Sequence, residues 1–256
     1  MTEESVILTE PRGAVLVITI NRPDARNSMN KAAAEAMGQA LDQLDGDANL
    51  SVGVITGAGK GFSAGMDLKG FAGGEFPVAG DRGFAGIAQR SARKPLIAAI
   101  EGFALAGGLE IALACDIIVA SREAKLGIPE VGVGLFAGAG ALLRLPRRVG
   151  VGQAALLGLT GKPISGEEGH RIGLVDRLVD AGSALTEALT LAETIAANAP
   201  LALAATKAVV VDGFTKPDAE FWEWQQQFFQ EVFTSKDAIE GATAFAEKRR
   251  PNWQGQ

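Results

Sequence analysis

The sequence predicts an α/β fold followed by a helical carboxy-terminal region, and three observations predict it. Short runs rich in β-branched residues alternate with alanine-rich stretches of helical periodicity as far as Ala181. Beyond Ala181 the strand signals stop while helical ones continue. The chain of 256 residues has 47% hydrophobic residues and 33 glycines, which fits a globular protein with close backbone approaches.

The alternation of strand and helix signals predicts the order of the elements in the first part of the chain. Strands alternating with helices imply a sheet with both faces covered by helices. We expect strands at 6–10, 14–20, 52–56, 96–100, 116–120 and 173–179, and helices at 30–44, from Gly107 and at 138–149.

The carboxy-terminal quarter reads as helices at 183–198, 200–212, 217–233 and 235–248. We therefore divide the chain into a core, residues 1–182, and a helical oligomerisation region, residues 183–256. Aromatic rows at helical spacing usually belong to a core, but in a terminal extension they can equally pack on a neighbouring subunit. The last two helices carry Phe221, Trp222, Trp224, Phe228, Phe229, Phe233 and Phe245.

Composition and charge exclude several classes of partner. The net charge is −6 and the lysines and arginines are scattered, so we expect no nucleic acid and no anionic lipid as a partner. The apolar run 96–115 contains Glu101 and Glu110, which favours a buried strand and helix over a membrane span. Cys115, the one cysteine, reads as a core residue, and with no signal peptide we expect a cytoplasmic protein.

A carboxylate in the middle of an apolar helix is the first sign of chemistry. The stretch "LAGGLEIALACD" (105–116) places Glu110 there, and burying an unpaired carboxylate costs several kcal/mol. The helix that begins near Gly107 offers free backbone N–H groups, and so does the short helix that follows Gly65, near Met66. Together they could hold one carbonyl oxygen. Close packing of helix and sheet is the alternative explanation of the Gly-Gly pair.

A second carboxylate completes the pattern. Glu110 follows Gly107 by three residues, about 4.5 Å along a helix, so it can reach the region in front of the helix start. Glu130 follows Pro129 at the start of a helical turn, where it could equally complement the helix dipole. Two acids beside an oxyanion pocket suit a reaction through an enolate, because the N–H donors take the developing charge while the acids move protons.

The chain resembles the enoyl-CoA hydratase/isomerase (crotonase) superfamily over essentially its whole length. The resemblance is carried, in order, by "VITINRPDARNSMN", "GKGFSAGMDLK", "KPLIAAIEGFALAGGLEIALACDIIVA", "AKLGIPEVGVGL" and "EGATAFAEKRRPNW". It implies a spiral of ββα units with a helical carboxy-terminal trimerisation region. It also implies binding of acyl-CoA thioesters, stabilisation of a thioester enolate and a place in fatty acid metabolism. The expected assembly is a homotrimer or a dimer of trimers.

Carried onto this sequence, the resemblance assigns the oxyanion donors to the backbone N–H groups of Met66 and Gly107. The two hydratase glutamates fall on Glu110 and Glu130, and their separation, 130 − 110 = 20 residues, matches the hydratase pattern. CoA arrives as part of the substrate, and we expect no metal or other cofactor. The expected substrate-binding residues are Ala25, Arg26, Ala64, Asp67, Leu68, Lys69, Gly138 and Lys248, of which Gly138 helps to place the water.

The sequence departs from the hydratase pattern at residues 137–145. Many hydratases read "PGAGGTQRL" where this chain reads "AGAGALLRL", with Leu142 and Leu143 in place of a polar pair. The change bears on acyl preference, so carnitinyl-CoA-like and sterol side-chain thioesters stay open as substrates. The glycine-rich stretch 70–86 reads as a mobile segment that lines the acyl pocket.

Three other functions compete with hydration. An enoyl-CoA isomerase would need only one carboxylate, Glu130, and a non-catalytic acyl-CoA binder would need neither. A serine hydrolase needs a base, but the one histidine, His170, lies in a polar helix end, and there is no GxSxG motif. We therefore predict an enoyl-CoA hydratase.

Overall fold

A six-stranded sheet forms the centre of the molecule in the computed structural model, which describes residues 5–256. Its order is β1-β2-β3-β4-β6-β9, and all neighbours are parallel except β1 and β2. Strands β2, β3, β4 and β6 are buried almost throughout, as their continuous apolar runs require. The strands are β1 (Ile7–Arg12), β2 (Val15–Ile20), β3 (Val52–Gly57), β4 (Leu96–Ile100), β6 (Ile117–Ser121) and β9 (Arg177–Val179).

A second, three-stranded sheet gives the chain its spiral course. It contains β5 (Phe103–Leu105), β7 (Lys125–Gly127) and β8 (Ile164–Ser165), in that order. Two successive turns of the chain each place one strand in the large sheet and the next in the small one: β4 then β5, and β6 then β7. Helical segments follow: α3 (Gly107–Leu113) after β5, and the 3-10 helix η3 (Pro129–Val133) after β7. Because β5 and β7 are parallel neighbours, the starts of α3 and η3 meet at one edge.

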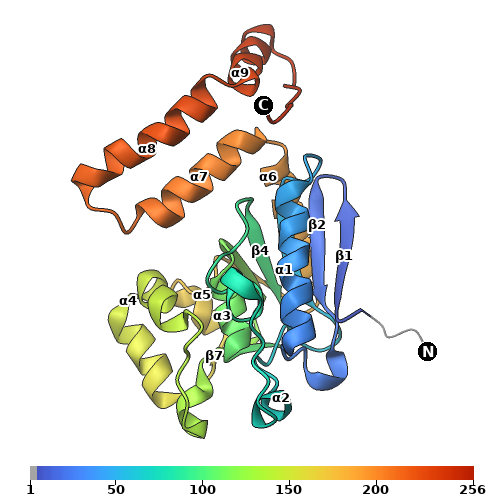
Figure 1. Cartoon of the computed structure of the whole chain (residues 1–256), viewed down its shortest axis with the longest axis vertical. Coiled ribbons are helices and arrows are strands. Elements are labelled where there is room, and N and C mark those ends of the chain that lie inside the picture. Colours follow the sequence, from blue (N-terminus) through green and yellow to red (C-terminus); the bar gives the residue numbers. More distant parts are fainter. Residues whose placement is uncertain (1–4) are drawn as a thin grey trace.

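Helices cover both faces of the large sheet (Figure 1). Helix α1 (Lys31–Gly46) lies on one face and is capped by Asn30, whose Oδ1 accepts from Ala33 N at 2.9 Å. Helix α6 (Ala184–Ala196) lies on the other, where its small buried side chains allow a close approach to the strands. The hydrophobic cluster between α6 and the sheet contains Ala184, Ala188 and Ala192 of α6 with Val54, Ile97 and Val119 of the sheet.

Shorter helical segments lie between these elements. They are η1 (Pro23–Ala25), α2 (Leu68–Ala72), η2 (Gly80–Arg82) and α5 (Gly166–Arg171). The stretch 70–86 is held in place rather than loose, because Arg82 is buried and its guanidinium pairs with Asp42 and donates to the carbonyl of Arg90. The helix expected at 138–149 is α4 (Ala141–Thr160), which starts later and continues beyond a kink at Gly150 (φ 78, ψ 159).

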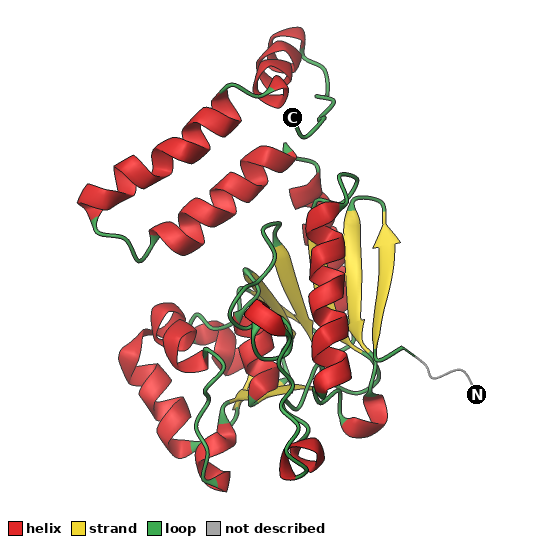
Figure 2. Ribbon diagram, viewed as in Figure 1, coloured by secondary structure: helices red, strands yellow, loops and turns green. Residues whose placement is uncertain are grey.

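The last three helices, α7 (Pro200–Gly213), α8 (Asp218–Phe233) and α9 (Lys236–Glu247), extend away from the sheet (Figures 1 and 2). Lys207 joins α7 to the core, since its Nζ lies 2.8 Å from Asp116 Oδ2 and 2.9 Å from Lys94 O. Because α6 packs on the sheet, the part that leaves the core begins at Pro200. The division at residues 182 and 183 stays a prediction, and residues 1–4 of its first part lie outside the described residues.

Among residues 5–256 no single helix is long and apolar enough to cross a membrane, and only α6 and α7 taken together reach that length, across a bend of 111°.

Candidate active site

Two backbone N–H groups from separate loops lie side by side at the start of α3. A Cβ atom added to Gly65 would lie 2.6 Å from Gly107 N, so the loop before α2 and the start of α3 are in direct contact. Within residues 5–256, neither Met66 N nor Gly107 N donates a hydrogen bond to the protein. These are the two groups that the sequence predicts as oxyanion donors, and the structure brings them together.

The loop that carries Met66 is fixed by a buried polar network. Asn27 donates through Nδ2 to Ala58 O and Gly61 O at 2.8 and 2.7 Å. Ser63 Oγ donates to Asn27 O at 2.8 Å and accepts from Gly65 N at 3.1 Å. Asn27 is 1% exposed and has a left-handed φ of 54°, a conformation that asparagine tolerates better than most residues. The network holds the 61–65 backbone against the 27–29 segment and thereby fixes the direction of Met66 N–H.

The α3 side of this pair is also constrained. Ala106, immediately before Gly107, has φ 51° and ψ −128°, which is strained for a residue with a Cβ atom. A Cβ atom on Gly107 would lie 2.4 Å from the ring of Phe84, so a side chain does not fit there. Strain that turns an N–H group outward is typical of a functional site, and Phe84 brings the 70–86 segment to the same place.

Glu110 is buried and held by backbone donors. Its side chain leaves α3 toward the turn before α4, where Oε1 accepts from Ala139 N at 2.7 Å and from Ala141 N at 3.1 Å. The residue is 3% exposed, and this burial raises the pKa of its carboxyl. The two N–H bonds and the charge of Arg144 act in the opposite direction, because they stabilise the ionised form.

Glu130 has the contrasting environment. It lies in the first turn of η3, and its Oε2 is buried without a hydrogen-bond partner within the described chain. Burial raises the pKa of Glu130 to about 6. Its own backbone N–H opposes this rise, and the charge of Glu110 adds a smaller one. An unpaired buried acceptor next to a second carboxylate is a place for a water molecule or a polar group of a ligand.

Most of the predicted substrate-binding residues surround the Met66 loop. Ala64 N donates to Arg26 O at 3.0 Å, which places Ala64 beside the left-handed turn after Ala25. Asp67 caps α2 and pairs with Arg22 at 3.0 Å, and this hydrogen-bonded pair keeps the pKa of Asp67 below its usual range although burial opposes it. Leu68 and Lys69 open α2 at the surface.

Gly138 and Lys248 lie in different places. Gly138 precedes Ala139 in the turn that holds Glu110, so it belongs to the same site. Lys248 ends α9, which lies at the opposite end of the molecule from α2 (Figure 1). Within one chain, therefore, the structure does not bring Lys248 and Lys69 together.

The remaining predicted features lie outside this site. Cys115 is buried, which raises its thiol pKa to about 12 and makes it a core residue. His170 lies in α5 with its ring bonded to Val175 O at 2.9 Å, away from the two glutamates in sequence and fold. Leu142 and Leu143 are 49% and 54% exposed on the first turn of α4.

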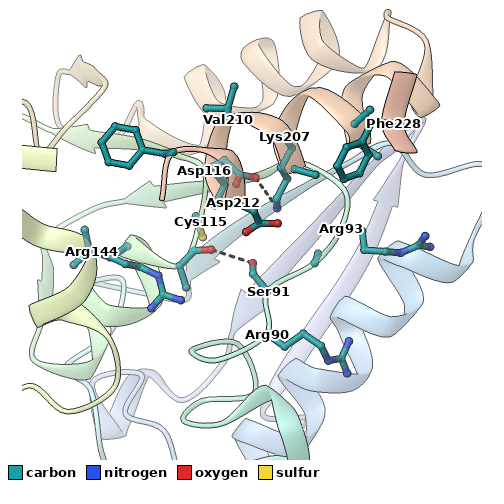
Figure 3. A pocket seen from close by; sticks show the side chains of 18 of the residues that line it. Arg90, Ser91, Arg93, Cys115, Asp116, Arg144, Lys207, Val210, Asp212 and Phe228 are labelled. Atoms are coloured by element: carbon teal, nitrogen blue, oxygen red, sulfur yellow. Dashed lines mark hydrogen bonds and ion pairs between the residues drawn. The ribbon is translucent and has the colours of Figure 1, made fainter. Parts of the chain in front are cut away.

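A cavity of about 680 Å³ lies between the core and helices α7 and α8 (Figure 3). It is lined by the end of α3 that is remote from Gly107, by Arg144 and by the Lys207–Asp116 pair. Neither glutamate and neither oxyanion residue lines it. This space is therefore separate from the candidate active site.

Sequence reasoning missed the groups that hold Glu110. The donors are the main-chain N–H groups of residues 139 and 141, and no pattern of side chains in the sequence predicts them. The "GAGA" stretch before α4 is the one available signal, because such a run marks the free N–H groups at a helix start.

A model of the family described as "Enoyl-CoA hydratase/isomerase" matches residues 10–256. The chain belongs to this family. Its relatives include Enoyl-CoA hydratase EchA19 of Mycobacterium tuberculosis, 41% identical over 97% of this chain and 96% of that protein. Carnitinyl-CoA dehydratase of Salmonella typhi is 40% identical over 99% of both chains.

Solved structures agree. A crystal structure of enoyl-CoA hydratase EchA1 from Mycobacterium marinum has a TM-score of 0.96 at 52% identity, covering 99% of this chain and 100% of that one. A carnitinyl-CoA hydratase from Mycobacterium avium has a TM-score of 0.79 at 42% identity, covering 99% and 100%. The predicted crotonase-like α/β fold is confirmed.

The pKa of Glu130, and its dependence on the charge of Glu110, can be measured in the protein without any ligand. In a ¹³C NMR titration of carboxyl-labelled glutamate, with the resonance assigned by its loss in Glu130→Gln, we expect Glu130 to titrate near pH 6. Glu110→Gln removes a neighbouring negative charge, so it should lower the pKa of Glu130. A Glu130 that titrates at its ordinary value near 4.5, or that ignores Glu110→Gln, would contradict this description of the site.

Proposed function

We propose that the protein is an enoyl-CoA hydratase that adds water across the 2,3 double bond of an enoyl-CoA thioester. One observation carries the proposal. Two differently held carboxyl groups, one fixed by N–H donors and one with an unpaired oxygen, lie on elements that meet beside two free N–H groups. The family membership and the hydratases among its relatives support it.

In the proposed reaction the thioester carbonyl oxygen accepts hydrogen bonds from Met66 N–H and Gly107 N–H. This polarises the conjugated double bond and stabilises the negative charge that develops on the oxygen. The donors are already fixed by the Asn27–Ser63 network and by Ala106, so little reorganisation is needed as the charge forms.

The two glutamates act on one water molecule. The ionised Glu110 and Glu130 orient the water, its oxygen forms a bond to Cβ, and Glu130 takes one of its protons. Glu130 then gives this proton to Cα, which discharges the enolate. Its raised pKa suits a group that takes and returns a proton, while the two N–H groups that bond to Glu110 favour the ionised form of that carboxyl against the effect of burial. The reaction draws on CoA only as part of the substrate, without a metal or a separate cofactor.

Carnitinyl-CoA-type thioesters form a second candidate substrate class. The observation that favours them is the group of relatives named carnitinyl-CoA dehydratase or hydratase, at 40–42% identity over nearly the whole chain. Removal of water from a 3-hydroxyacyl thioester is the reverse of the reaction above and uses the same groups, so both classes fit one site.

The helical extension supports a trimer or a dimer of trimers. Four aromatic side chains of α8 and α9 form an exposed aromatic row, and large exposed apolar surfaces of this kind mark protein–protein contacts. Trp222, Phe229, Phe233 and Phe245 are 46–88% exposed. We propose that Lys248 contacts the CoA of a neighbouring subunit, since it is remote from the site of its own chain. We propose a cytoplasmic location, in keeping with a single, buried cysteine, and a place in fatty acid metabolism, in keeping with the hydratases among the relatives.

The first test of function removes each acid in turn. We expect Glu110→Gln and Glu130→Gln each to lower kcat for crotonyl-CoA hydration by about 10²–10⁴, followed as loss of the conjugated thioester absorbance. The double variant should lose far less than the product of the two effects, because both groups serve one transition state. His170→Gln is the control and should keep near wild-type turnover.

Other patterns would contradict the proposal. An isomerase would lose its activity with Glu130→Gln but keep much of it with Glu110→Gln. A binder would show no turnover in any form of the protein, with unchanged affinity for acyl-CoA.

The oxyanion pair is tested by Gly65→Ala. The new Cβ atom would lie 2.6 Å from Gly107 N and 3.1 Å from Leu105 O, so the two N–H groups must move apart. We expect kcat to fall by about 10²–10³, the usual loss for one oxyanion donor. Gly13→Ala is the control, since Gly13 also has a positive φ but faces open space in the β1–β2 turn. Equal turnover in the two variants would refute the assignment.

The assembly is tested by sedimentation. We expect a species of three or six copies of the 26.4 kDa chain, and Phe233→Asp should shift it toward smaller species by charging the aromatic row. Gln227→Asp, on another side of α8, should leave the mass unchanged. A wild-type protein that sediments as a stable monomer at micromolar concentration would rule the assembly out.

A further inference from the structure

Arg144 occupies a position that ordinary helix chemistry does not explain. It lies in the first turn of α4, where the helix dipole disfavours a positive charge, and it is half-buried. Burying a guanidinium is costly unless it is paired, so the location needs a reason.

The guanidinium packs directly on the turn that holds Glu110. A Cβ atom on Gly140, which has φ 107°, would lie 2.1 Å from Arg144 Nη1, so the guanidinium fills the space where a side chain would be. Arg144 Nη2 donates to Ala88 O at 2.6 Å, and Arg144 N donates to Gly140 O at 3.0 Å. These contacts join the turn to the segment before β4.

The carboxyl group of Glu110 accepts hydrogen bonds from the same turn, from the backbone N–H groups on either side of Gly140. Residues 139–141 therefore lie between the carboxylate and the guanidinium. The charged groups that act on this arrangement are few. Glu110 attracts Arg144, Arg147 repels it, and the titratable thiol of Cys115 also acts on it, while Glu130 is the like-charged neighbour of Glu110.

We propose that Arg144 is a positioning residue of the hydratase site. It holds the 139–141 turn in the conformation that presents two N–H groups to Glu110, and it places a positive charge on the other side of that turn from the carboxyl group. The inference rests on the proposed function. It goes further by adding a residue outside the predicted catalytic and substrate-binding set, at the edge of the separate cavity between the core and helices α7 and α8 (Figure 3).

The proposal predicts a specific change in the pH profile. Both glutamates act ionised, so kcat/KM falls as the pH drops through the apparent pKa of the coupled pair. Removing a positive neighbour raises the pKa of a carboxyl group, so Arg144→Met should move this acid limb to higher pH. At the optimum pH we expect kcat to fall about 10- to 100-fold, the lower part of the range for a positioned base, with KM changed by less than about threefold.

Two further variants separate positioning from mere stabilisation. Arg144→Lys keeps the charge but loses the planar guanidinium with its several donors. Compared with Arg144→Met, its acid limb should therefore lie close to that of wild type, while its kcat recovers only in part. In a Glu110→Gln background, Arg144→Met should have little further effect on kcat, because the group through which it acts is gone. Arg147→Met is the matched control, an exposed arginine on the same helix whose loss changes the net charge equally.

The outcomes are distinct. Suppose that wild type hydrates crotonyl-CoA. If the acid limb of the kcat/KM profile is then the same in Arg144→Met and Arg147→Met, the positioning role is wrong. It is also wrong if the kcat losses of Arg144→Met and Glu110→Gln multiply in full in the double variant. If Arg144→Met does not fold, Arg144→Lys decides: we expect a kcat several-fold below that of wild type with an acid limb close to that of wild type, and an unchanged kcat would contradict the positioning role. If wild type hydrates no enoyl-CoA, it is the proposed function that fails.

Discussion

The buried carboxylate of Glu110 is the constraint on which the rest of the site depends. A charge in the middle of an apolar helix is stable only if its lone pairs meet donors, and here Ala139 N and Ala141 N supply them at 2.7 and 3.1 Å. Those donors are free because they lie where α4 begins, and they face α3 because the spiral returns the chain to that edge after β7. The fold therefore supplies hydrogen-bond donors to Glu110 inside an apolar core, and these donors favour the ionised carboxylate while burial opposes it.

The contact of Gly65 with Gly107 imposes the second constraint. A side chain at Gly65 would lie 2.6 Å from Gly107 N, so it would force apart the two loops that carry the predicted N–H donors. The long-range bonds of Asn27 and Ser63 and the strained Ala106 hold these loops from outside the site. The cost of such strained positions is offset by the large core, to which Phe62 and Leu109 of the same segments contribute.

Periodicity predicted the elements that have enough residues to show it. The first strands, α1, α3 and the carboxy-terminal helices were placed within a few residues, since each is long or bounded by asparagine, glycine or proline. Strands β5 and β7 were missed because three residues carry no period, although they set the meeting of α3 and η3. The 70–86 stretch looked loose from its glycines, yet Arg82 holds it through contacts distant in sequence.

The residues of the candidate site also divide into those that the sequence predicts and those that it does not. The glutamates and the glycines stand out because their residue types conflict with an apolar helix or a tight turn. Their partners do not stand out, because main-chain N–H groups carry no residue type and Arg144 resembles any helix-surface arginine until the turn of residues 139–141 is seen. Lys248 stands out by its motif, but the end of α9 that carries it lies at the opposite end of the molecule from α2 (Figure 1).

The central claim is that one water molecule, held by the two glutamates, is split between Cβ and Cα of an enoyl thioester. Mass spectrometry of the product formed from crotonyl-CoA in D₂¹⁸O tests it most directly. The account predicts a 3-hydroxyacyl-CoA that carries one ¹⁸O and one deuterium on carbon, at Cβ and Cα respectively. Recovery of an enoyl-CoA that has gained deuterium but no ¹⁸O, or that has gained neither, would contradict it.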